Sequence, residues 1–201
     1  GINMCEDDKY FPGCNWLDPS HHYNELCSTN FWVLINQRMH RLFPDDAHYV
    51  DEMENSIYNV LLAAQVEDKG YHYLNFLERS KDWRWLDRAT CCSAMGTRLA
   101  ALLPQFLYTY TGDTVYADIY SQSEATLPLD AGNVTLRCET DMPESGHVRI
   151  TVVDCAAPFT LKLRHPRWAV EGGKSYYETI EGVKAGDVFE LDLPFGFKTT
   201  L

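Results

Sequence analysis

The sequence lacks both a long apolar segment and an excess of basic charge. No apolar run approaches the ~20 residues that a membrane-spanning helix needs, so we expect no membrane partner. Lys and Arg number 17 against 29 Asp and Glu, which gives a formal net charge of -12. Such an acidic surface disfavours nucleic acid as the main partner and is compatible with a neutral small molecule.

The seven cysteines do not form a recognisable disulfide framework, because their number is odd and their spacing irregular. We therefore expect a reducing compartment, and no signal peptide is visible. From these two observations we expect a cytoplasmic protein. The chain opens with Gly1 rather than Met, and we expect it to be part of a longer protein. It shows no internal repeat and no low-complexity stretch.

The first half of the chain has the apolar spacing of helices. One predicted helix, "STNFWVLINQRMHRLF", has Ser28 or Thr29 as its cap and an apolar stripe formed by Trp32, Ile35, Met39 and Leu42. A second, in "DDAHYVDEMENSIYNVLLAAQV", has Asp45 or Asp46 as its cap and an apolar face formed by Tyr49, Met53, Ile57, Val60 and Ala64. A third, in "MGTRLAALLPQFLY", is kinked or ended by Pro104.

From about residue 112 the apolar period changes to two, which is typical of strands. Val148, Ile150 and Val152 alternate in "GHVRITVVD", and "FTLKLRH" and "DVFELDLP" alternate in the same way. Turn signals such as "EGGK" and "KAGD" separate these runs. We predict an α+β protein with a helical domain over residues 1–110 and an antiparallel β-sandwich domain over residues 111–201.

Two short motifs carry metal-binding chemistry. Glu25 and Cys27 form an E-x-C pair before the first helix, and Cys91 and Cys92 form a C-C pair before the third. Residues one or two apart do not share a helix face, so each pair must lie on a loop or a first helical turn to reach a common point. Three thiolates and one carboxylate make a tetrahedral set for zinc. The alternative is a group of separate buried or free cysteines.

Aromatic and histidine residues gather in "WLDPSHHY", "GYHYLNF" and "DWRW". Aromatic rings can stack on the C–H faces of sugars, so these segments suit a carbohydrate-binding cleft. The alternative interpretation is that the rings belong to the hydrophobic core.

The order of motifs resembles glycoside hydrolase family 127. The segment "CCSAMGTRLAALLPQFLYTYTGDTVYADIYSQS" is similar to a family pattern in which a cysteine pair precedes R-L-L-x-x-L-P-Q-Y-I-Y. "NELCSTNFW", "VDEMENSIYNVLLA", "GYHYLNFLERS" and "APFTLKLRHPRWA" resemble further family segments in the same order. The resemblance implies the C-terminal part of an (α/α)6 barrel followed by a β-sandwich.

For function, the resemblance implies a zinc-dependent retaining β-L-arabinofuranosidase. Glu25, Cys27, Cys91 and Cys92 match the metal ligands, and Cys91 matches a zinc-bound thiolate nucleophile. Tyr73 and Glu54 match positions near the sugar pocket. For the acid/base we take Glu6, the only glutamate before Glu25.

The sequence departs from the family pattern at two positions after the cysteine pair. Ser93 stands where the family often has Pro, and Met95 where Asn is usual. Two other interpretations stay open: a non-catalytic carbohydrate-binding or structural-zinc protein of the same fold, and a redox switch formed by Cys91 and Cys92. We expect a small-molecule carbohydrate substrate, and a homodimer is an open alternative to a monomer.

Overall fold

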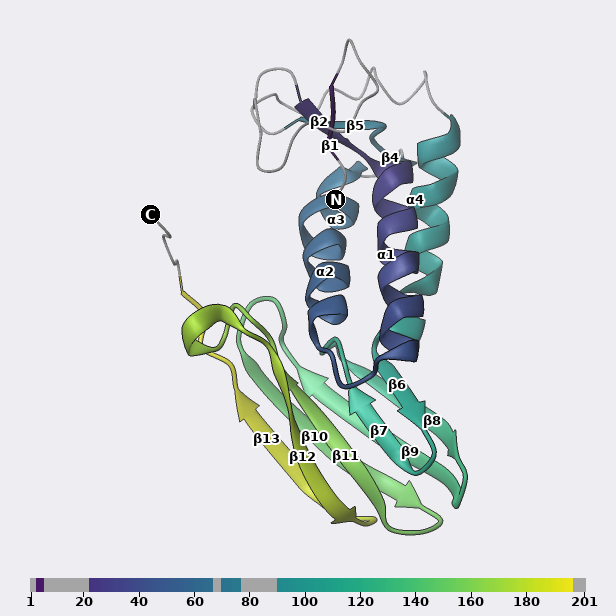
Figure 1. The fold of residues 1–201 in the computed structure, drawn as a ribbon, viewed down its shortest axis with the longest axis vertical. Helices are drawn as coiled ribbons and strands as arrows, with labels where there is room; N and C mark the ends of the chain where they lie inside the picture. The colour runs from purple at the N-terminus through teal and green to yellow at the C-terminus, as the bar shows by residue number, and fades with distance from the viewer. Residues whose placement is uncertain (1–2, 6–21, 67–69, 77–89, 197–201) are drawn as a thin grey trace. The chain divides into compact units, whose positions relative to one another are not determined.

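The computed structural model describes residues 3–5, 22–66, 70–76 and 90–196 (Figure 1). It is a mixed α+β protein, as expected, and it divides into two compact units. The first unit comprises residues 1–39 and 52–104, and the second comprises residues 40–51 and 105–201. The predicted boundary at residue 110 stays a prediction. Among the described residues, no helix has the length and apolar character required to cross a membrane.

Helices dominate the first half of the described chain. They are α1 (Leu26–Leu42), α2 (His48–Ser56), the π-helical turn η1 (Ile57–Leu61), α3 (Leu62–Ala64), α4 (Thr90–Leu102) and the 3-10 turn η3 (Leu103–Phe106). The α-helical part of the third predicted helix ends at Leu102, two residues before Pro104, as expected because proline disrupts helical hydrogen bonding. The Asp46 carboxylate accepts a hydrogen bond from the His48 backbone N–H at 3.1 Å, so Asp46 caps α2.

Short strands accompany these helices. β1 (Asn3–Cys5), β2 (His22–Glu25) and β5 (Leu74–Phe76) form a sheet in the order β1-β2-β5, and β3 (Gln65–Val66) pairs with β4 (Gly70–Tyr71). β2 continues directly into α1, so the helix begins at Leu26. The prediction that Ser28 or Thr29 caps this helix is wrong. Thr29 lies one turn inside the helix, and its hydroxyl donates back to the carbonyl of Glu25 at 3.2 Å.

The buried face of α1 also differs from the predicted stripe. Ile35 and Leu42 are 53% and 69% exposed, whereas Val33, Asn36 and His40 are buried. The polar members of this face are tolerated because they find hydrogen-bond partners: the Asn36 amide, for example, donates to the carbonyl of Trp32 at 2.8 Å. The predicted face of the second helix is largely correct, since Met53, Ile57, Val60 and Ala64 are all buried.

The second unit contains two four-stranded sheets. Their strands are β6 (Tyr108–Thr111), β7 (Thr114–Ala117), β8 (Ser123–Leu129), β9 (Gly132–Thr140), β10 (His147–Cys155), β11 (Phe159–His165), β12 (Tyr176–Val183) and β13 (Val188–Asp192). The sheet orders are β13-β10-β9-β8 and β12-β11-β7-β6, and all pairs are antiparallel except β7 with β11. Within the described part after residue 120, the only helical element is the short 3-10 turn η4 (Glu171–Gly173).

One hydrophobic core joins the two sheets. Val148, Ile150 and Val152 of β10 are fully buried, as the alternating pattern predicts. They belong to the same cluster of buried side chains as Leu161 and Leu163 of β11, which lies in the other sheet.

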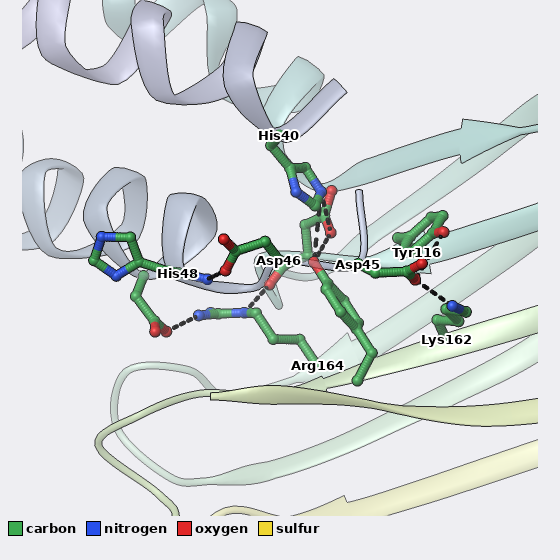
Figure 2. A network of polar contacts seen from close by, with 10 residues as sticks. His40, Asp45, Asp46, His48, Tyr116, Lys162 and Arg164 are labelled. Carbon is green, nitrogen blue, oxygen red and sulfur yellow. Dashed lines mark hydrogen bonds and ion pairs between the residues drawn. The ribbon is translucent and has the colours of Figure 1, made fainter. Parts of the chain in front are cut away.

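Segment 40–51 packs in the second unit through polar contacts, two of them buried (Figure 2). Arg164 Nη1 lies 2.8 Å from the Asp51 carboxylate, and both side chains are buried. His40 Nε2 lies 3.2 Å from the buried carboxylate of Asp118. Lys162 is ion-paired with Asp45 and holds the pKa of that carboxyl below its ordinary value. None of these partners could be inferred from local sequence patterns, because they are 70 residues or more apart.

Candidate metal centre

Three of the four predicted metal ligands come together in the first unit. The sulfur atoms of Cys27, Cys91 and Cys92 all lie within 4.8 Å of one another. Cys27 is the second residue of α1, and Cys91 and Cys92 lie in the first turn of α4. Both motifs therefore lie at helix starts, where residues one or two apart can reach a common point, as expected from the sequence.

Packing between α1 and α4 holds the cysteines together. The sulfur atoms of Cys27 and Cys92 are 3.1 Å apart, and one turn further along both helices the Asn30 amide contacts the Met95 sulfur at 3.5 Å. A glycine at position 96 permits this approach. A Cβ atom there would lie 2.4 Å from the Tyr71 ring and 2.9 Å from the Leu26 side chain.

Burial differs sharply among the three thiols. Cys92 is 0% exposed, Cys27 is partly buried and Cys91 is exposed. Burial raises the pKa of both Cys27 and Cys92 above the ordinary value of 9.0, and the neighbouring cysteines also affect both pKa values. In the metal-free protein these two groups therefore retain their protons as thiols near neutral pH.

The chemistry of this group fits a metal ion. Three soft sulfur donors favour zinc and other thiophilic metals over magnesium or calcium. Tetrahedral Zn–S bonds of ~2.3 Å would place sulfurs ~3.8 Å apart, and the three sulfurs, all within 4.8 Å of one another, lie near enough for such an arrangement.

Glu25 is not part of the three-residue group. It is the last residue of β2, is half-buried, and its carboxylate does not lie within 4.8 Å of all three sulfurs. Its negative charge nevertheless contributes to raising the pKa of Cys27, after the larger effect of burial.

The two predicted sugar-binding residues lie in different elements. Tyr73 is half-buried and precedes Leu74, whose backbone pairs with Glu25 across β5 and β2. Glu54 is buried in α2. Glu6, the predicted acid/base, lies outside the described residues.

Two residues near the cysteines, Ser93 and Gly96, support them in a way that the local sequence pattern does not predict. The Ser93 hydroxyl donates to the carbonyl of Tyr71 at 3.4 Å, which links the first turn of α4 to β4. The isolated glycine at position 96, inside a helical pattern, was the signal that could have revealed the close contact.

Two sequence profiles match the chain in order. Residues 6–105 match "Beta-L-arabinofuranosidase, GH127 catalytic domain" and residues 114–194 match "Beta-L-arabinofuranosidase, GH127 middle domain". No curated protein sequence matches the chain.

Solved structures resemble the chain over most of its length. A GH127 beta-arabinofuranosidase matches with a TM-score of 0.80 and 23% identity, covering 96% of this chain and 36% of that one. A GH127 beta-L-arabinofuranosidase from Geobacillus stearothermophilus T6 matches with a TM-score of 0.77 and 22% identity, covering 96% and 35%. A structure described as a glycoside hydrolase matches with a TM-score of 0.72 and 23% identity, covering 96% and 38%.

At these identities the structural likeness shows the fold alone, and the chain spans little more than a third of each solved structure. The two profiles, by contrast, match nearly the whole chain and come from a single family. The chain belongs to glycoside hydrolase family 127.

Proposed function

We propose that this chain forms part of a retaining glycoside hydrolase that releases L-arabinofuranose or a related furanoside from glycans. The observation that carries the proposal is the convergence of the Cys27, Cys91 and Cys92 sulfurs at two helix starts. Membership of family 127 and the description of two structural neighbours as arabinofuranosidases favour the same reaction.

The proposed metal is zinc, with Cys27, Cys91, Cys92 and Glu25 as ligands. Three sulfurs need a fourth donor to complete a tetrahedron, and the Glu25 carboxylate is already close enough to influence the pKa of Cys27. When bound, zinc would keep the coordinating sulfurs deprotonated near neutral pH, although burial favours the thiol form of Cys27 and Cys92.

Cys91 is the proposed nucleophile. Both members of the C-C pair could bind the metal, but only Cys91 is exposed, and the sulfur of Cys92 is enclosed by protein. The Cys91 sulfur attacks the anomeric carbon while the bond to the leaving oxygen breaks, which produces a thioglycoside on Cys91. This role replaces the second carboxylate of the usual retaining pair.

A carboxyl group must complete the reaction. As an acid it protonates the leaving oxygen, and as a base it then takes a proton from the water that cleaves the thioglycoside. We propose Glu6 for this role. Tyr73 is proposed to contact the sugar, because its neighbour Leu74 is paired with Glu25, and Glu54 is the second proposed binding residue.

The wider architecture is also a proposal. The helices would be the last part of an (α/α)6 barrel within residues 1–110, and the two sheets would form a β-sandwich within residues 111–201. Three thiols that must remain reduced to bind a metal suit a reducing compartment, so we propose a cytoplasmic location.

The test combines zinc analysis with hydrolysis of an aryl β-L-arabinofuranoside by the purified protein. We expect one zinc per chain, release of the aryl group, and covalent labelling of Cys91 by a mechanism-based L-arabinofuranosyl probe. Cys91→Ser should abolish labelling and hydrolysis, whereas Cys155→Ser, which changes a partly buried cysteine of β10, should leave both unchanged.

A second candidate function is a non-catalytic protein with structural zinc. Four protein ligands make a closed site, which is the pattern of structural rather than catalytic zinc. Bound zinc without labelling or hydrolysis would favour this second function. Label on Cys92 or Glu6 would instead overturn the assignment of the nucleophile.

A further inference from the structure

One short contact within the cysteine group joins two different helices. The sulfurs of Cys27 and Cys92 are 3.1 Å apart, and both residues are free thiols. The contact between Asn30 and Met95 lies three residues further along each helix, so α1 and α4 run side by side with a constant register. The two sulfurs are therefore held by packed helices rather than by loops.

This geometry favours one disulfide over its alternatives. A disulfide bond is ~2.05 Å long, so the two sulfurs need to approach by only about 1 Å, which side-chain rotation can supply. Cys91 and Cys92 are neighbours on one helix, where adjacent side chains point in different directions. A bond between them would require distortion of the first turn of α4.

We propose that Cys27 and Cys92 form a reversible disulfide when no metal is bound, so that the metal centre is also an oxidation site. The co-reactant is a low-molecular-weight disulfide such as oxidised glutathione. Cys27 first gives up its proton to water, and its sulfur attacks one sulfur of the reagent, so that the other sulfur leaves and takes up a proton as a reduced thiol. The Cys92 thiol then loses its proton as its sulfur attacks the Cys27 sulfur, and the second reduced thiol is released with a proton. Overall, two protein thiols are oxidised, and the reagent gains two electrons and two protons.

The burial of the two residues agrees with this order of events. Cys27 is partly exposed and can meet a reagent in solution, whereas Cys92 is fully buried and can react only with a sulfur beside it. The bond would remove two of the three sulfurs from the metal group, so oxidation and metal binding would exclude each other. This last consequence rests on the metal site of the proposed function.

Thiol counting and peptide mapping test the proposal. Metal-free protein is treated with oxidised glutathione, denatured, and its free thiols are counted. We expect the Cys27 and Cys92 thiols to be lost together, a cross-linked peptide pair containing both residues, and recovery of both thiols with dithiothreitol. Protein loaded with zinc beforehand should keep these two thiols.

Two variants test whether any cysteine other than Cys27 and Cys92 is needed for the cross-link. Cys91→Ser should still form the cross-link, and Cys155→Ser, outside the group, should behave like the unchanged protein. A cross-link between Cys91 and Cys92, persistent glutathione adducts without a cross-link, or no loss of thiols would overturn the proposal. Peptide mapping of the unchanged protein decides the pairing even if a variant fails to fold. The disulfide measurement uses no sugar substrate. Its outcome therefore does not depend on whether the protein hydrolyses an arabinofuranoside.

Discussion

At the scale of single residues, burial decides which charges matter for stability. The side chains of Arg164 and Asp51 are 0% and 3% exposed, and their charged groups lie 2.8 Å apart. The side chains of Arg137 and Glu124 form an equally short ion pair, but each of them is about half exposed to solvent. Removing one partner of a buried pair leaves an uncompensated charge away from water. An exposed pair is screened by solvent and contributes little.

We therefore predict that Arg164→Met lowers the free energy of unfolding by about 3–5 kcal/mol. Urea denaturation measures this value, and Arg137→Met is the matched control, with an expected loss of about 1 kcal/mol or less. Adding Asp51→Leu to Arg164→Met should recover part of the loss, because no unpaired charge then remains. Equal losses for the two arginine variants would contradict the explanation.

The buried thiol of Cys138 makes the free energy of unfolding fall as the pH rises into the alkaline range. Burial raises the pKa of Cys138 from 9.0 to about 11 in the folded protein. Its stabilising contribution is complete below pH 9 and is lost as the pH rises to about 11, because the unfolded chain ionises first. The loss amounts to about 2–3 kcal/mol at 1.36 kcal/mol per pKa unit.

Comparison with Cys138→Ala isolates this contribution. The variant is expected to be less stable at neutral pH, but its free energy of unfolding should fall less steeply between pH 9 and 11. Parallel pH profiles for the two proteins would show that Cys138 ionises equally easily in both states.

At the scale of elements, the contact between α4 and its neighbours depends on a missing side chain. Alanine normally favours a helix over glycine by about 1 kcal/mol. At position 96, however, the added methyl group would overlap the Tyr71 ring and approach Leu26. Overpacking of this kind typically costs about 1–3 kcal/mol.

We predict that Gly96→Ala is destabilising and weakens zinc binding, because moving α4 away from α1 separates Cys92 from Cys27. Thermal unfolding and zinc titration measure the two effects. Thr97→Ala, at the neighbouring exposed position, should change stability by about 0.5 kcal/mol or less and leave zinc affinity unchanged. A stabilised Gly96→Ala protein with normal zinc affinity would show that the helices can repack.

At the scale of the whole molecule, a metal bound only by the folded protein adds to stability. At a free metal concentration 100 times the dissociation constant, the gain is about 2.7 kcal/mol. The three cysteines all lie in the first unit, so the stabilisation should concern that unit and not the β-rich second unit.

We predict that chelation of zinc lowers the melting temperature of the first unit and that restoring zinc reverses the change. Helical circular dichroism follows this unit during heating. Cys92→Ser should make melting insensitive to the chelator, whereas Cys155→Ser should retain the full response. An identical response in all three proteins would place the metal elsewhere.

Some features of this protein follow from the sequence alone. The alternation of Val148, Ile150 and Val152 defines one face of a strand, because successive side chains of a strand point to opposite sides. The helical face of Met53, Ile57 and Val60 follows from its spacing in the same way. The order of the motifs was sufficient to identify the family, because the family resemblance depends on residue types and their order along the chain and not on three-dimensional distances.

Other features were decided only by tertiary structure. Asn36 and His40, rather than Ile35 and Leu42, face inward on α1, because polar groups can be buried where the fold supplies partners. The spacing of the cysteines allowed them to meet but did not determine which two touch. The contact of Cys27 with Cys92 exists because α1 and α4, 65 residues apart, pack through a glycine, and local sequence patterns carry no information about such a contact.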